Sequence, residues 1–153
     1  MKKFALDNGF GARGSTWYRP TEDSILVLNL QRSRYGHRYF LNVAIWLRAL
    51  GDTSWPPESS CHIRSRLTQL VDADLVDRTN NLLDPDFSID DHVRQSELLG
   101  LLTDTLQPIA RASESLDALH SSTARQILLD RALVRREAWP LVFGESPPDY
   151  GQH

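Results

Sequence analysis

Cys61 and His62 are adjacent, and a thiol beside an imidazole is a common start for nucleophilic catalysis. The reactive form of cysteine is the thiolate, which a neighbouring base can produce. The pair opens residues 61–67, whose alternation of apolar and polar types predicts a β-strand. Neighbours on a strand point to opposite faces, so the two side chains could not share a proton. We therefore expect Cys61 to pack as a small apolar residue, and we assign no catalytic residue.

Two segments imitate ligand-binding motifs. Residues 9–14 match G-x-G-x-x-G, but a dinucleotide site needs a strand before the glycines and a helix after them. Here a helix is expected before and a strand after, so we interpret the glycines as a helix end and a turn. Residues 84–90 resemble the start of a calcium loop, yet Ile89 replaces its glycine and Gln95 its glutamate. We expect a solvated acidic loop there, no metal site and no cofactor.

Basic side chains form the remaining candidates. His62, Arg64 and Arg66 alternate along the expected strand 61–67 and so share one face. Two arginines on one face repel each other unless an anion lies between them, either a ligand or an acidic side chain of the second half. A second group crowds one hairpin turn beside Tyr35, where the alternatives are a solvated turn and a phosphate contact: Arg32, Arg34, His37 and Arg38.

The elements that must position these residues follow from periodicity and turn chemistry. Strands are expected over residues 15–19, 25–31, 39–47 and 61–67, after a short helix over residues 2–8. We predict one domain over residues 1–153. Its parts are a short helix and sheet (2–70), an acidic loop (71–91), a helical part (92–140) and a tail (141–153). Strands followed by helices indicate an α+β fold in which C-terminal helices pack on one face of a four-stranded antiparallel sheet.

Because successive side chains on a strand point to opposite faces, each residue can be assigned to one face of this sheet. One face is aliphatic and is expected to meet the helices, with Leu26, Leu28, Val43 and Ile45 among its members. The other face mixes polar, basic and aromatic groups, and it is where we expect a ligand. The candidate ligand-binding residues are Asn29, Gln31, Asn42, His62, Arg64 and Arg66.

Several segments of this half resemble a mostly bacterial family of uncharacterised domains, catalogued as domain of unknown function 4304. The residues that carry the resemblance lie between positions 8 and 67: Asn8-Gly9-Phe10, residues 15–19 (STWYR), residues 28–36 (LNLQRSRYG), residues 40–43 (FLNV) and residues 61–67 (CHIRSRL). The resemblance implies a compact α+β domain and no established activity. Function must therefore be argued from the residues.

Charge is divided unevenly along the chain. Residues 1–70 hold ten Lys and Arg against five Asp and Glu, and residues 71–153 hold seven against fifteen, so +5 and −8 combine to −3. The overall negative charge argues against a general nucleic-acid binder. No apolar run is long enough to span a membrane. The single cysteine and the lack of a secretory signal favour the cytoplasm.

Two functions from different classes fit these features. The first is a small cytosolic protein-binding module, such as an immunity-type protein whose acidic half neutralises a basic partner. The second is an enzyme or sensor for a small phosphate- or carboxylate-bearing ligand on the polar sheet face. One helix is expected over residues 123–138, and its apolar residues lie on several sides, which indicates either burial or a homodimer. The protein-binding module is the function we favour.

Overall fold

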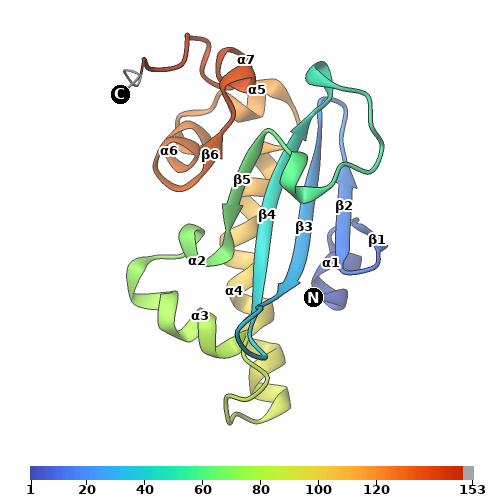
Figure 1. The fold of residues 1–153 in the computed structure, drawn as a ribbon, viewed down its shortest axis with the longest axis vertical. Helices are drawn as coiled ribbons and strands as arrows, with labels where there is room; N and C mark the ends of the chain where they lie inside the picture. Colours follow the sequence, from blue (N-terminus) through green and yellow to red (C-terminus); the bar gives the residue numbers. More distant parts are fainter. Residues whose placement is uncertain (150–153) are drawn as a thin grey trace.

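A computed structural model describes residues 1–149 of the chain. Its sheet has six antiparallel strands, and each strand pairs with the next one along the chain (Figure 1). This order needs only short turns between most neighbours, because antiparallel strands can be joined by hairpins. The strands are β1 (Gly11–Arg13), β2 (Thr16–Pro20), β3 (Ser24–Arg32), β4 (Tyr39–Leu47), β5 (Ile63–Arg66) and β6 (Leu133–Val134).

The four expected strands are confirmed as β2 to β5, but the expected total of four is wrong. β1 forms because Gly14, at φ 61°, turns the chain so that Gly11 pairs with Tyr18. Glycine adopts this left-handed backbone at little cost. β6 arises inside the segment expected to be one helix, where Ala132 becomes extended and Val134 pairs with Ile63. Pairing satisfies backbone groups at the edge of β5, which local periodicity does not reveal.

One long helix, α4 (Asp91–Ala112), lies behind the sheet, and the short α1 (Lys2–Asp7) lies beside it (Figure 1). Asp90 caps the start of this helix, because its side chain accepts hydrogen bonds from the N–H groups of His92 and Val93. Pro108 does not interrupt it, and the helix continues for another turn to Ala112. The expected aliphatic face is confirmed, because its leucines, valine and isoleucines form one buried core with Leu102, Leu106 and Ile109 of α4.

The segment expected to be an acidic loop contains a helix of its own, α3 (Val76–Leu82). This helix packs against the rest of the protein through its buried residues Thr79 and Leu82. The remaining helices are α2 (Leu67–Leu70), α5 (Leu116–Leu119), α6 (Ser122–Arg131) and α7 (Trp139–Phe143). The last of these occupies the start of the expected tail 141–153, of which residues 150–153 lie outside the described residues. No helix within residues 1–149 combines the length and apolarity that a membrane span requires.

Candidate functional site

A row of four polar residues crosses the sheet face opposite α4. Strand register places Thr16 of β2 opposite Asn29, Asn29 opposite Asn42, and Asn42 opposite Arg66 of β5. We call these four residues the amide row. Three of them were predicted as ligand-binding residues, and the pairing brings them together. Thr16 was missed, because only the register of β2 against β3 aligns it with the others.

The amide row is linked by its own hydrogen bonds. Asn29 Nδ2 donates to Thr16 Oγ1 at 2.9 Å, and Asn42 Nδ2 donates to Asn29 Oδ1 at 3.2 Å. Asn42 Nδ2 also donates to Gln31 Oε1 at 2.9 Å, while Asn42 Oδ1 accepts from Arg66 Nε at 3.1 Å. Asn42 is buried, and burial without these partners would be costly. The predicted residues Asn29, Gln31, Asn42 and Arg66 therefore form one structural network.

Arg66 is the exposed end of this network. Its guanidinium carbon lies 4.4 Å from the centre of the Phe40 ring, within the range of a cation–π contact. Within residues 1–149 it forms no ion pair. The crevice between Arg66 and Phe40 has no room for a water molecule. A ligand here would lie on the surface rather than in a cavity.

Arg64 does not share the surroundings of Arg66. Its Nε and Nη2 donate to the two carboxylate oxygens of Glu58, at 2.9 and 3.3 Å. The anion expected near this arginine is thus an acidic side chain, but one from the first half of the chain rather than from the second. Such two-point pairs are geometrically specific, and this one fastens the β4–β5 loop to the sheet. Glu58 and Asp52 are the only acids between residues 49 and 60, which is the one sequence signal that could have suggested the pair.

His62 lies apart from the amide row and is buried. Its Nδ1 accepts a hydrogen bond from the Leu47 N–H at 3.0 Å, and its ring packs 4.3 Å from that of Trp46. Burial lowers the pKa of His62, and Arg135 adds to the lowering against an opposite effect of Glu137. The structure therefore does not place His62 with the other predicted ligand-binding residues, and its Nδ1 is already occupied by the Leu47 N–H. Trp46 in turn donates from Nε1 to the carbonyl of Gly51 at 3.0 Å.

Cys61 packs as a small apolar residue, as expected, although it and His62 precede β5 and do not lie within the expected strand 61–67. It is fully buried in a second cluster with Tyr18, Ile25, Val27 and Ala44. Burial and the nearby Glu58 carboxylate raise the pKa of its thiol to about 12, although Arg64 and Arg135 oppose the shift. A thiol with this pKa is almost entirely protonated near neutral pH, so it is a poor nucleophile.

The predicted basic turn lies at the far end of the β3–β4 hairpin, and all four of its members are exposed. His37 Nδ1 lies 2.7 Å from Asp86 Oδ2 of the loop before α4. The three arginines, Arg32, Arg34 and Arg38, form no ion pair within the described part of the chain. Tyr35 at the tip is 98% exposed. The structure therefore does not bring the basic turn together with Arg64 and Arg66.

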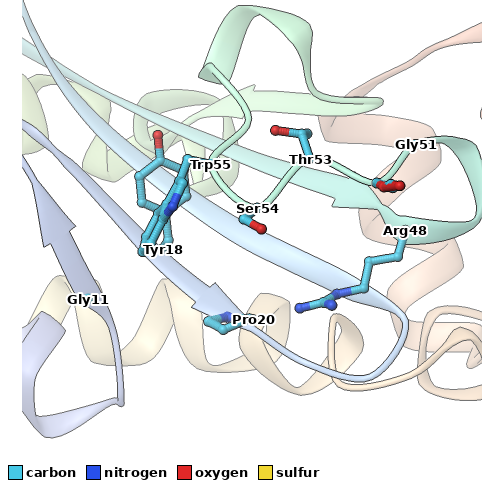
Figure 2. A pocket seen from close by; sticks show the side chains of 9 residues that line it. Gly11, Tyr18, Pro20, Arg48, Gly51, Thr53, Ser54 and Trp55 are labelled. Atoms are coloured by element: carbon cyan, nitrogen blue, oxygen red, sulfur yellow. The ribbon is translucent and has the colours of Figure 1, made fainter.

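A cleft of about 610 Å³ lies at the opposite end of the same sheet face (Figure 2). The β4–β5 loop forms one side of this cleft, and β1 and β2 contribute to the other. Trp55 is 48% exposed, its ring centre is 5.1 Å from that of Tyr18, and the Arg13 guanidinium lies 4.6 Å from it. We call this the aromatic cleft, lined chiefly by Tyr18, Pro20, Arg48, Asp52, Ser54 and Trp55. None of the predicted site residues lies in residues 49–60, and Trp55 beside two prolines is the one sequence signal there that could have indicated the cleft.

Sheet topology, the covering helix and the polar row together define an α+β protein with one helix-covered sheet face and one partly open face. A scan against family models matches residues 1–112 to "Domain of unknown function (DUF4304)". The chain belongs to this family, and the match extends beyond residue 67 to the end of α4. Searches of curated proteins and of solved structures give no match.

Proposed function

We propose that this chain is a small protein-binding module whose partner is basic, as expected of an immunity-type protein. The observation that carries the proposal is the pattern of ion pairs. Of the eight pairs within residues 1–149, two join residues 1–70 to the acidic second half: Arg19–Glu114 and His37–Asp86. The remaining pairs lie within one half or the other. The excess of carboxylates in the second half is therefore not neutralised by the basic half.

Eight of the fifteen acids of residues 71–153 lie between residues 72 and 97, along the turn before α3, α3 itself and the start of α4. In Figure 1, α3 and the start of α4 lie toward the lower end of the molecule. Within this segment Arg78 is already paired with Glu97 at 2.6 Å, and the Arg94 guanidinium donates to backbone carbonyls. The basic turn lies at the same end, where His37 pairs with Asp86, so the carboxylates border a basic patch. Leu75 and Val93 are 39% and 44% exposed in the same region. Apolar contacts surrounded by charge are the usual composition of a protein interface. We call this the acidic surface, whose exposed carboxylates are Asp74, Asp77, Asp90 and Asp91.

Binding to a purified partner tests this proposal. The partner is the basic protein that the native chain retains from its own cell at low salt, and its affinity is then measured against rising salt. The variant Asp74→Lys/Asp77→Lys should weaken binding by about tenfold or more, because like charges replace complementary ones. The matched control Asp117→Lys/Asp149→Lys makes the same change in net charge at exposed positions elsewhere, and it should change affinity by less than about threefold.

Three results would contradict the proposal. One is a chain that remains alone at low salt. Another is a retained partner that is acidic. The third is an equal loss of affinity in the two double variants, which would indicate a general charge effect without a docking surface.

A further inference from the structure

We propose that the aromatic cleft binds a small planar molecule that carries a carboxylate or phosphate group. This site is separate from the acidic surface, and its lining holds one cation, Arg48, and one carboxylate, Asp52. It is also separate from the amide row, where the neighbouring crevice has no room for a water molecule. The volume of the aromatic cleft, about 610 Å³, is typical of small-molecule sites.

One wall of the cleft is aromatic and held in place. Tyr18 is buried and packs edge-on against the Trp55 ring, at an interplanar angle of 81°. The Arg13 guanidinium lies over the same ring. These contacts restrain Trp55 while about half of its surface stays open. A restrained, half-exposed indole favours stacking with a flat ligand, because little side-chain freedom is lost on binding.

Arg48 supplies the group that selects an anion. Its side chain extends across the cleft toward Pro20, and the Ser54 hydroxyl lies nearby (Figure 2). Within residues 1–149 its guanidinium donates once, from Nε to the Ser24 carbonyl at 3.5 Å, and forms no ion pair. Its two terminal nitrogens are thus available for a two-point contact with a carboxylate or phosphate. The arginine and the aromatic wall together favour a planar anion as the ligand.

Asp52 is the one carboxylate in the lining. Its substitution can therefore show whether the cleft binds an anion or a cation. It does not pair with Arg48 or with Arg13. Next to a bound anion, Asp52 would be repulsive. Asp52→Asn should therefore tighten binding of an anion by a few fold, whereas it would weaken binding of a cation.

The experiment is a titration of the full chain followed by amide and indole NMR signals. The probes are benzoate, indole-3-acetate and adenosine monophosphate. Each is compared with a neutral counterpart: benzamide, indole-3-acetamide and adenosine. At least one anion should shift the signals of Gly51, Ser54 and the Trp55 indole, and its neutral counterpart should bind more weakly. Arg48→Gln should lower the affinity for that anion about tenfold. Arg111→Gln, which removes an exposed arginine of α4 outside the cleft lining, should leave the affinity unchanged.

Several outcomes would overturn the proposal. No shift with any of the three anions at millimolar concentration would exclude a site for planar anions of this size. Equal binding of each anion and its neutral counterpart would assign the cleft to aromatic stacking alone. Weaker binding in Asp52→Asn would indicate a cation site. Unchanged melting temperatures of the Arg48 and Asp52 variants confirm that affinity changes do not reflect unfolding.

Discussion

His62 is held in its neutral form by its surroundings. Its Nδ1 accepts from the Leu47 N–H, and a protonated imidazole has no free lone pair with which to do so. Burial moves the pKa of His62 down from 6.5. A buried histidine on the polar sheet face thus serves to join β4 to the residue before β5, through one ring nitrogen.

This arrangement predicts how stability depends on pH. The unfolded state takes up the His62 proton near pH 6.5, and the folded state takes it up only at lower pH. Between those values the unfolded state binds more protons, so the free energy of unfolding falls as pH falls below about 6.5. Urea unfolding of the His62→Asn variant should show a shallower acid-side loss than the natural chain. His92→Asn, at an exposed position, serves as control; equal slopes in all three proteins would contradict the prediction.

Arg94 joins two helical elements through backbone carbonyls. Its Nη1 donates to the carbonyls of Leu82 at 2.8 Å and Asp84 at 3.0 Å, and its Nη2 donates to that of Phe87 at 2.6 Å. The last carbonyls of a helix have no partner within the helix. One side chain of α4 thus completes the end of α3 and orders the loop that follows.

Removal of the Arg94 guanidinium should destabilise the junction between α3 and α4. Arg94→Met keeps the apolar stem but leaves the carbonyls without their charged donor, at a cost of about 2 kcal/mol in the free energy of unfolding. Amide hydrogen exchange in residues 82–90 should also accelerate. The matched control is Arg111→Met on the same helix, where the exposed side chain forms no hydrogen bond within the described residues. An equal, small effect of both substitutions would show that the Arg94 contacts add nothing to stability.

At the scale of the whole molecule, the family match and the folding unit differ in extent. The match ends at Ala112, but Leu119, Leu128, Val142 and Phe143 belong to the same buried core as the sheet. Beyond the match, the Ser113 carbonyl also accepts a 2.8 Å hydrogen bond from Thr21, and β6 extends the sheet. Residues 113–149 are therefore part of the fold in this chain.

A truncated chain of residues 1–112 should fail to fold cooperatively. Each core side chain left uncovered costs about 1.5–3 kcal/mol. A domain of this size has only about 5–15 kcal/mol of stability in total. Circular dichroism and thermal melting of the truncated chain test this directly. A cooperative transition at the melting temperature of the full chain would show that the matched region is an independent unit.

An element of the fold could be predicted where its own residues carry a periodic pattern, and could not where a distant pairing partner forms it. The alternation in residues 25–31 and 39–47 identified both sheet faces, because each strand pairs along its whole length and buries one side. The helix α3 and the strand β6 were not predicted. Val134 pairs with Ile63, 71 positions away, so its own neighbours in sequence carry no sign of it.

The same division holds for the candidate site. Residue types and strand period by themselves determined that Asn29, Asn42 and Arg66 share a polar face, and that the two halves differ in charge. Tertiary structure decided the rest: it joined Thr16 to the row, paired Arg64 with Glu58, buried His62 and placed Trp55 against Tyr18. The physical reason is that the period of a strand assigns a face to each residue. Strand register and the path of a loop then decide which side chains meet on that face.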